Sequence, residues 1–494
     1  MAWDPEFEIA FKPKTIAVVG AQREPPPWGD FVANLQNAGY RGRIYPVNPR
    51  VGDGEIRGLK AYPDLASVPE PIDLVIVTVP AAAVPAVLED CIEANAKNVH
   101  IFTAGFGETG EEKGIELERQ IEQIARRGEL RVLGPNCMGL HVPAAGITTW
   151  ETFTPQAGPV AFISQSGGHC GVFTGDGARF GIYFSKVISF GNALFFDSTD
   201  FLEYVANDPE TGIICMYLEG VRDGKKLIEL VREINKTKPV IVWKGGLTDW
   251  GAKAAASHTG SMAGNKEIWD AFYRQTGAVR VDTMEELYDV TMTFLCLPPL
   301  GGRRIALMGA GGGNSVAGAD VCAREGLELP TLTEKTLKEL GSFIPPEGTF
   351  ITNPLDIGVV LRDINILLRS LEPIAADPLI DSIIFVMPLQ LVFGGMNLSV
   401  LGSQDQPAIR AEIDKQVGVV LDSIIKFNRE NVPHKPLIMA LQAGIGPLLP
   451  GGRARVQQDL MRAKIPVYLS LDRASRAVAK FVQYHEYRSR EGLD

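Results

Sequence analysis

The sequence predicts an α/β protein of three domains, each built around a mainly parallel sheet. Two observations predict this fold class. Short apolar stretches rich in β-branched residues alternate with stretches rich in Glu, Lys and Arg, which is the pattern of strands followed by helices. The alternation restarts three times with a strand and a Gly or Ser turn, and 494 residues at about 150 residues per domain also give about three domains. We therefore expect three Rossmann-like or flavodoxin-like domains.

Each expected domain begins with a strand that leads into a glycine-rich turn. The three opening strands are expected at residues 15–20, 159–164 and 304–309. Further strands are expected at 74–79, 99–102, 130–133, 213–218, 240–243, 383–387 and 437–441. Helices are expected between them, for example at 113–127 and 225–236, and a loop at 391–406. With boundaries in the Gly- and Pro-rich stretches at 141–158 and 297–302, the expected domains are residues 1–145, 146–298 and 299–494.

The composition excludes several classes of protein. There are 48 basic and 59 acidic residues, and the net charge of −11 argues against nucleic-acid binding and anionic-membrane binding. The six cysteines form no CxxC pair, which predicts free thiols in a reducing compartment rather than disulfides or a metal site. The first residues lack the pattern of a signal peptide, and Pro80 and Pro85 interrupt the longest apolar run, at 74–88. We expect a soluble cytoplasmic protein.

The glycine turns after the three opening strands are candidate anion sites. A helix that starts at such a turn presents N–H groups and its positive end to a ligand, and ligands of parallel sheets bind at the carboxyl ends of the strands. In the second domain, Ser164, Ser166 and Gly167 add hydroxyl groups to the turn. The turn Gly20-Ala21-Gln22 lacks the full GxGxxG pattern and the chain has no GxxxxGK[ST] loop, so neither a nicotinamide cofactor nor a P-loop nucleotide is favoured. The alternative is that each glycine only forms a tight turn.

Two further features of the first domain are candidates for nucleotide contacts. Asn48, Pro49 and Arg50 form a basic turn after the expected second strand, and a guanidinium group pairs with phosphate through two hydrogen bonds. A solvated surface turn is the alternative. Val79 and Pro80, at the end of the next strand, offer an apolar ledge to a ring.

His258 is the main candidate nucleophile of the second domain. It stands in the segment Ser257-His258-Thr259-Gly260-Ser261, where small polar neighbours leave room for a bulky group such as phosphate. An imidazole can accept a phosphoryl group when a carboxylate orients it, and Glu219, after the strand at 213–218, is the candidate orienting group. The alternatives are a structural histidine and a solvated acid.

Taken in order, these segments resemble the alpha subunit of the NDP-forming acyl-CoA synthetases, which are relatives of succinyl-CoA synthetase. The matching segments are TIAVVGAQ (15–22), GRIYPVNPR (42–50), DLVIVTVPA (73–81), TAGFGETG (103–110), LGPNCMGL (133–140), ISQSGG (163–168), MYLEG (216–220), PVIVWKGG (239–246), ASHTGSMAG (256–264), MGAGGG (308–313) and NPLDI (353–357). The run from 133 to 264 is the most specific part, because several rare motifs follow in the family's order. His169 and Cys170 depart from the pattern, since family members commonly have small apolar residues there.

The resemblance implies a role for each candidate residue. His258 would be the phosphorylated histidine, stabilised by Glu219. The phosphoryl group would be held at one helix N-terminus by Ser164, Ser166 and Gly167. It would be held at a second station by Gly311, Gly312 and Gly313. The nucleotide part of CoA would contact Gly20, Ala21, Gln22, Asn48, Pro49, Arg50, Val79 and Pro80. The thioester end of CoA would lie near Asn136 and Cys137.

The implied activity interconverts carboxylic acid, CoA and ATP with acyl-CoA, ADP and phosphate through an acyl phosphate and a phosphohistidine. The three expected domains leave no place for the family's ATP-grasp domain. The resemblance therefore implies a separate ATP-grasp beta subunit that binds ATP or ADP with Mg²⁺, in an α2β2 assembly. A non-catalytic CoA-binding regulatory protein is one alternative, although it would not need His258 and Glu219. A Rossmann oxidoreductase is the other, although the first glycine motif is incomplete. The acid and the choice between ADP and GDP are not predicted.

Overall fold

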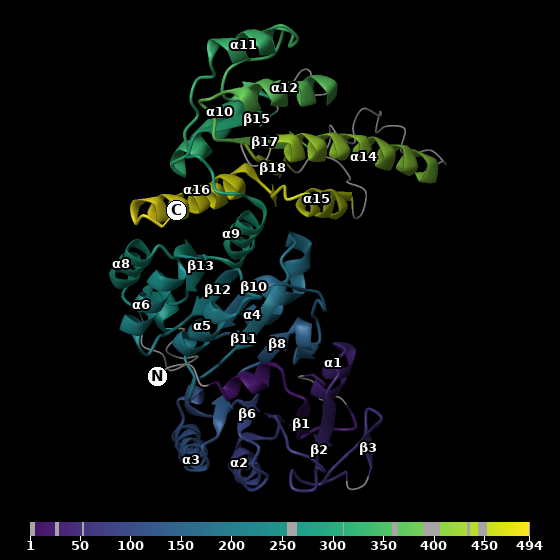
Figure 1. Cartoon of the computed structure of the whole chain (residues 1–494), viewed down its shortest axis with the longest axis vertical. Coiled ribbons are helices and arrows are strands. Elements are labelled where there is room, and N and C mark those ends of the chain that lie inside the picture. The colour runs from purple at the N-terminus through teal and green to yellow at the C-terminus, as the bar shows by residue number, and fades with distance from the viewer. Residues whose placement is uncertain are drawn as a thin grey trace. The chain divides into compact units, whose positions relative to one another are not determined.

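Figure 1 shows the computed structural model, coloured from the N-terminus to the C-terminus. It describes residues 5–24, 29–51, 54–253, 264–309, 311–357, 364–388, 406–431, 435–442 and 452–493. The chain divides into two compact units: Met1–Ala178 with Ile182–Leu287, and Arg179–Gly181 with Tyr288–Asp494. Among the described residues, no helix has both the length and the apolar character needed to cross a membrane.

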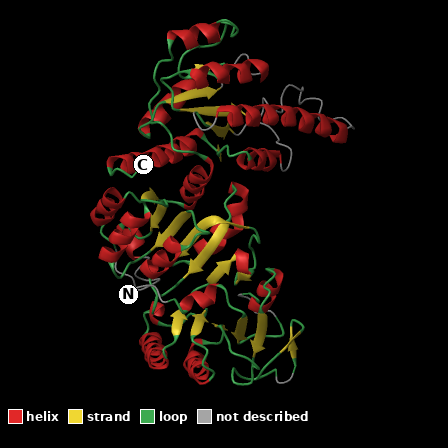
Figure 2. Cartoon of the chain, viewed as in Figure 1, coloured by secondary structure: helices red, strands yellow, loops and turns green. Residues whose placement is uncertain are grey.

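The first unit contains two sheets surrounded by helices (Figure 2). Its first sheet is parallel and has the order β2-β1-β5-β6-β7. The strands are β1 (Thr15–Val19), β2 (Arg43–Val47), β5 (Leu74–Val77), β6 (Asn98–Ile101) and β7 (Arg131–Leu133). A small antiparallel hairpin is formed by β3 (Glu55–Ile56) and β4 (Leu59–Lys60). The helices are η1 (Phe7–Phe11), α1 (Phe31–Asn37), η2 (Ala81–Ala83), α2 (Val84–Glu93), η3 (Gly107–Thr109) and α3 (Glu112–Gly128).

The second sheet of this unit has the order β14-β13-β12-β10-β11-β8-β9. Its last two strands, β8 (Gly139–Val142) and β9 (Ile147–Thr148), are antiparallel additions at one edge. The parallel strands are β10 (Ala157–Ser164), β11 (Phe184–Ser189), β12 (Ile213–Leu218), β13 (Val240–Lys244) and β14 (Val279–Val281). The helices are η4 (Pro143–Ala145), α4 (Gly167–Gly177), η5 (Ala178–Phe180), α5 (Ser198–Asn207), α6 (Gly224–Ile234), α8 (Lys266–Thr276) and α9 (Met284–Cys296), the last of which continues into the second unit.

The second unit contains a third parallel sheet, with the order β16-β15-β17-β18-β19. The strands are β15 (Ile305–Gly309), β16 (Leu355–Asp356), β17 (Ser382–Pro388), β18 (Leu437–Gln442) and β19 (Val467–Tyr468). The helices are α10 (Gly312–Arg324), α11 (Glu334–Gly341), α12 (Ile364–Ala376), α14 (Gln406–Asn431), α15 (Gly452–Arg462) and α16 (Leu471–Arg490).

Side-chain caps start many of these helices. In α4, for example, the Ser166 hydroxyl accepts a hydrogen bond from the N–H of His169, which satisfies one of the N–H groups that the first helical turn leaves without a backbone acceptor. The same capping geometry occurs in five other helices, at Asp30, Asp223, Asn265, Thr333 and Ser470. Short polar residues therefore mark where strands end and helices begin.

The parallel strands of the three large sheets share one order, in which the first parallel strand lies inside the sheet. The chain passes from the first strand to a neighbour on one side and then returns to the other side, as in β11-β10-β12. The order reverses between β1 and β5, between β10 and β12, and between β15 and β17. Parallel sheets bind ligands at the carboxyl ends of the strands where the order reverses. The predicted α/β class with mainly parallel sheets is confirmed.

Details of the elements differ from the expectation in a few places. β8 lies in the second sheet, although the first domain was expected to extend to residue 145. The strand β11 was not predicted. The expected loop at 391–406 lies outside the described residues, apart from Gln406, where α14 begins. The two boundaries between the three expected domains stay a prediction.

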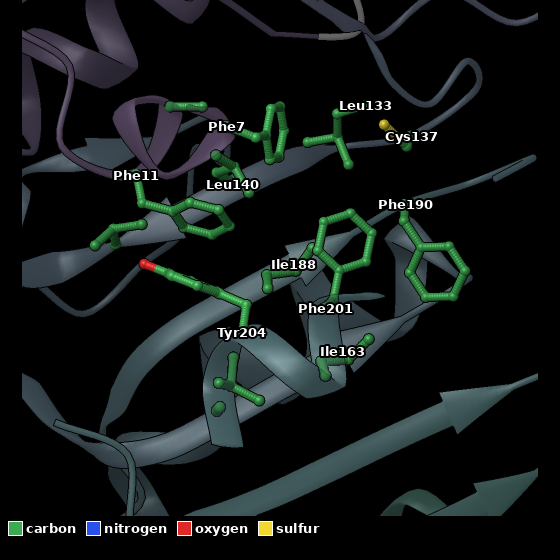
Figure 3. Packing of buried hydrophobic residues seen from close by; sticks show 14 of the residues in the cluster. Phe7, Phe11, Leu133, Cys137, Leu140, Ile163, Ile188, Phe190, Phe201 and Tyr204 are labelled. Atoms are coloured by element: carbon green, nitrogen blue, oxygen red, sulfur yellow. The ribbon is translucent and has the colours of Figure 1, made fainter. Parts of the chain in front are cut away.

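Aromatic packing near the N-terminus joins the two sheets of the first unit. The rings of Phe7 and Phe11 lie 4.4 Å from Phe196 and Tyr204, respectively. Figure 3 shows Phe7 and Phe11 within the buried cluster that also holds Phe201 of α5. Burial of such rings stabilises the contact through their large apolar area.

Truncation of Phe11 should destabilise the first unit. We expect Phe11→Ala to lower its free energy of unfolding by about 3–5 kcal/mol, because the fully buried ring leaves a cavity. The measurement is chemical denaturation of the whole chain. Ile9→Ala is the matched control, since Ile9 lies on the same short helix but is 46% exposed, and it should change stability by less than about 1 kcal/mol. Equal losses in the two variants would contradict this packing.

Candidate functional site

The turn after β10 forms the N-terminus of the 11-residue helix α4. The hydroxyl of Ser164 accepts a hydrogen bond from the N–H of Ser166 at 3.1 Å and donates one to the carbonyl of Ser166 at 2.9 Å. Gly167 packs closely against Met138: a Cβ at residue 167 would approach Met138 Cγ to 2.6 Å, so a larger residue would displace that side chain. Ser164, Ser166 and Gly167 are thus brought together where β10 ends, at the positive end of a helix.

Glu219 lies beside this turn because β12 is the neighbour of β10. Its side chain is 7% exposed, and one carboxylate oxygen accepts a hydrogen bond from the Tyr217 hydroxyl at 3.2 Å. The side-chain oxygen of Gln165 accepts hydrogen bonds from the N–H groups of Glu219 and Gly220, the latter at 2.8 Å. The predicted turn and the predicted carboxylate therefore occupy one edge of the sheet.

Lys244 adds a buried cation to the same edge. It ends β13, the next strand along, and is 5% exposed. Its ammonium group donates hydrogen bonds to the carbonyl oxygens of Glu219, at 2.9 Å, and of Gly245. Burial lowers the pKa of Lys244 to about 8, and the negative charge of Glu219 limits this shift.

His169 forms an aromatic cluster near the start of α4. Its ring lies 4.2 Å from the ring of Tyr217 and 4.6 Å from that of Trp243, and the last two rings are 4.9 Å apart. Burial lowers the pKa of His169 below its usual range, so the imidazole is neutral at pH 7. An apolar, aromatic wall thus lies beside the polar turn.

The predicted nucleophile His258 lies outside the described residues. The described chain resumes at Gly264, which lies against the site. A Cβ at Gly264 would approach Lys244 Cε to 3.2 Å and Trp269 Nε1 to 2.6 Å. Residue 258 is six positions before Gly264, and six residues of fully extended chain reach about 20 Å at most.

The first sheet brings the predicted nucleotide-contacting residues together at its own carboxyl edge. Gly20 has φ +94°, and a Cβ there would lie 2.8 Å from Thr78 Oγ1, so only glycine fits between the ends of β1 and β5. The side-chain amide of Asn48 donates to the carbonyl of Ala21 at 2.7 Å and accepts from the N–H of Arg50 at 2.9 Å. The other residues predicted to contact the nucleotide part of CoA are exposed or partly exposed at this edge, namely Gln22, Pro49, Val79 and Pro80.

Asn136 and Cys137 are adjacent in the sequence but differ in exposure. Asn136 is partly exposed, and its side-chain N–H donates to Asn192 Oδ1 at 3.3 Å. Asn192 in turn donates to Glu108 at 2.6 Å and Glu118 at 3.1 Å, which fixes its orientation. The thiol of Cys137 lies in the hydrophobic core (Figure 3), and burial raises its pKa. Only the backbone of Cys137 can therefore contact a ligand.

The third predicted glycine turn lies in the second unit. Gly311 has φ +87°, and its N–H donates to the carboxylate of Asp356 at 2.8 Å. Gly312 and Gly313 begin α10, and nothing lies within 4 Å of a Cβ built at Gly313. A cavity of about 380 Å³ adjoins this helix at the carboxyl ends of β15, β17 and β18. Its polar lining comes from Asn314, Ser315, Ser470 and Asp472.

Sequence reasoning missed three polar residues that organise these edges: Gln165, Asn192 and Lys244. Gln165 stood inside a predicted turn, and Lys244 is a charged residue at the end of an apolar strand, which is the usual signal of a functional strand end. Asn192 gave no local signal. In the described part of the chain, no group of three or more His, Cys, Asp or Glu side chains is arranged to hold a metal ion.

Two family models match the first unit. The CoA binding domain matches residues 14–143, and the succinyl-CoA ligase like flavodoxin domain matches residues 157–294. The first match contains all strands of the first sheet, and the second contains the parallel strands of the second sheet, from β10 to β14.

Proteins of known name match over most of the chain. The chain is 38% identical over 390 residues to the alpha subunit of acetate–CoA ligase [ADP-forming] II of Pyrococcus furiosus, covering 79% of the chain and 84% of that protein. It is 34% identical to the alpha subunit of isoenzyme I of the same organism, covering 98% of the chain and 99% of that protein. It is also 37% identical to acetate–CoA ligase [ADP-forming] I of Archaeoglobus fulgidus, covering 77% of the chain but only 55% of that longer protein.

A solved structure has the same fold. It is the dinucleotide forming acetyl-coenzyme A synthetase 1 of Ca. Korarchaeum cryptofilum in complex with phosphate and ADP. The TM-score is 0.80 with 30% sequence identity, and the match covers 99% of both chains.

Loss of the Gln165 acceptor should weaken the site's framework. We expect Gln165→Leu to lower the free energy of unfolding by about 1–3 kcal/mol, because two N–H groups at the end of β12 lose their acceptor. Thermal and chemical denaturation would measure the loss. Gln165→Glu retains an acceptor oxygen at the same length, so it should recover part of the stability if the hydrogen bonds matter. A Leu variant as stable as the wild type would contradict the assignment.

Proposed function

The chain belongs to the ADP-forming acyl-CoA synthetases, as an alpha-type subunit, and on this premise we propose that it moves a phosphoryl group between an acyl group and a nucleotide. In the proposed reaction, carboxylic acid, CoA and ATP are interconverted with acyl-CoA, ADP and phosphate. The observation that supports this most is the single sheet edge that combines the Ser164–Gly167 helix N-terminus with the buried carboxylate of Glu219.

In the direction of synthesis, the proposal has three balanced steps. A nitrogen of His258 attacks the terminal phosphorus of ATP, and ADP leaves. The carboxylate of the acid then takes the phosphoryl group from the histidine and becomes an acyl phosphate. The sulfur of CoA attacks the acyl carbon, and inorganic phosphate leaves as the thiol proton is lost. The imidazole divides one difficult exchange into two easier transfers.

The residues at the edge of the second sheet suit the histidine steps. N–H groups at the start of α4 can hold the phosphoryl oxygens without reorganising, since the Ser164 and Ser166 hydrogen bonds already fix the turn. The carboxylate of Glu219 can accept a hydrogen bond from one N–H of an imidazole. It would then stabilise the positive charge that develops on the ring when the other nitrogen is phosphorylated. We assign this orienting role to Glu219.

The edge of the first sheet suits the nucleotide part of CoA. Gly20, Ala21 and Gln22 form a turn that leaves room for close approach of a phosphate group, and Asn48 braces the turn. The exposed Arg50 side chain can pair with a phosphate, and Val79 with Pro80 offers an apolar surface. Asn136 would meet the thioester end, whereas Cys137 would contribute only its backbone.

The partner and the second phosphoryl site complete the proposal. The names of the Pyrococcus relatives as alpha subunits support a partner subunit. We propose that it is an ATP-grasp beta subunit that holds ATP or ADP and Mg²⁺, in an α2β2 assembly in the cytoplasm. Gly311, Gly312 and Gly313, at the N-terminus of α10, would receive the phosphohistidine at its second station.

A larger residue at Gly20 should impair CoA binding. We expect Gly20→Val to weaken CoA binding at least about tenfold, because the side chain meets Thr78 and requires a strained backbone at φ +94°. Calorimetric titration with CoA would measure the change. Gly224→Ala is the matched control, since nothing lies within 4 Å of a Cβ there. Unchanged affinity in a folded Gly20→Val protein would contradict the CoA assignment.

His258 should accept the phosphoryl group of ATP. With labelled ATP and the partner subunit, we expect acid-labile, base-stable label on the wild-type chain and none on His258→Ala. His485→Gln, which changes a histidine on α16, should retain the label. Label that persists on the His258 variant would refute the carrier role.

A further inference from the structure

Lys244 is a buried cation at the carboxyl edge that the proposed steps leave without a role. It is 5% exposed, and its ammonium group donates to the carbonyls of Glu219, at 2.9 Å, and Gly245. The Trp269 ring centroid lies 5.4 Å from the nitrogen. Burying an ammonium group costs free energy unless acceptors and charges compensate it, so a lysine here requires an explanation.

Hydrogen bonds to the described part of the chain use two of the N–H donors of Lys244. An ammonium group has three N–H donors, and the described part of the chain supplies two carbonyl acceptors. An uncharged side chain with two N–H donors could make the same two hydrogen bonds to carbonyl oxygens. What lysine adds is a positive charge next to the carboxylate of Glu219, at the strand end that neighbours the Ser164–Gly167 turn.

The charges at this edge explain why a cation is needed. A phosphoryl group held at the N-terminus of α4 would bring up to two negative charges to an edge that already contains the Glu219 carboxylate. Like charges in a poorly hydrated site repel each other strongly. The helix N-terminus supplies only about half a positive charge. A full positive charge is therefore needed for the carboxylate and the phosphoryl group to coexist.

We propose that Lys244 is a cationic residue of the phosphoryl site, which offsets the charge of Glu219 and donates its third N–H to the transferred phosphoryl group. This inference rests on the proposed function. It makes phosphoryl transfer depend on the protonated form of Lys244, because the neutral amine would leave the negative charges uncompensated.

Among the described residues near Lys244, Tyr217 and His169 have pKa values shifted away from the range between pH 7 and pH 9. Glu219 is on β12, and the hydroxyl of Tyr217 would lie 2.7 Å from a Cβ at Gly245. Burial raises the pKa of Tyr217 above 10, and burial lowers that of His169 below 6.5. Burial lowers the pKa of Lys244 to about 8, so it loses its proton in this range as the pH rises. Transfer should therefore slow as the pH rises through about 8.

The test compares the wild type with three variants in phosphorylation by labelled ATP with the partner subunit. Lys244→Arg keeps a positive charge that persists beyond pH 10, and Lys244→Met removes it. Lys238→Met is the matched control, because Lys238 precedes β13 at the opposite edge and also donates to main-chain carbonyls, those of Ala206 and Asp208 at 2.7 and 2.8 Å. Initial rates are measured between about pH 6.5 and pH 9.5.

We expect Lys244→Met to slow labelling by about 100-fold and Lys238→Met to leave the rate within about twofold at pH 7. The wild-type rate should fall above about pH 8, whereas the fall should be absent in Lys244→Arg. Should the Met variant fail to fold, the pH profiles of Lys244→Arg and the wild type decide. A fast Met variant, or an Arg profile that still falls near pH 8, would overturn the inference. No label on the wild type would instead refute the proposed function.

Discussion

The side-chain oxygen of Gln165 accepts hydrogen bonds from two N–H groups at the end of β12, and the candidate site depends on this contact. It joins the strand ends between which the order of the second sheet reverses. Lys244 adds a bond from the next strand to the carbonyl of Glu219. The helix N-terminus at Ser166, the carboxylate and the ammonium group are therefore attached to one rigid framework, as accurate positioning requires.

The three sheets repeat one arrangement at the point where the strand order reverses. Each of the three sheets has a strand end and a glycine-containing turn at its point of reversal, and in the second and third sheets a helix starts directly at the turn. At Gly20 and Gly311 the turn needs a positive φ, which favours glycine. Transfer between an acyl group and a nucleotide requires fixed sites at both ends and a carrier between them, and a repeated α/β unit provides the fixed sites.

The sequence predicts the fold class and the strand ends well, because periodicity and turn residues are local signals. The strand expected at 213–218 and the helix start at Gly167 agree with the structure. Local signals do not identify strand neighbours, so the hydrogen-bond partners of Gln165 and Lys244 could not be foreseen: they are 54 and 25 residues away. Nor does spacing predict side-chain direction, so it could not show that the thiol of Cys137 is buried while Asn136 is partly exposed. The first domain was expected to extend to residue 145, and pairing of β8 with β11 of the second sheet is a contact between strands that no local signal predicts.

The most direct test of the central claim needs neither nucleotide nor partner. The chain alone is incubated with labelled inorganic phosphate and a series of short acyl-CoA thioesters, and released CoA and protein-bound label are measured. If the chain holds the acyl, CoA and phosphohistidine steps, one thioester should release CoA in step with acid-labile label on the protein. Tight binding of CoA and phosphate without CoA release from any thioester would contradict the account and favour a CoA-binding regulatory protein.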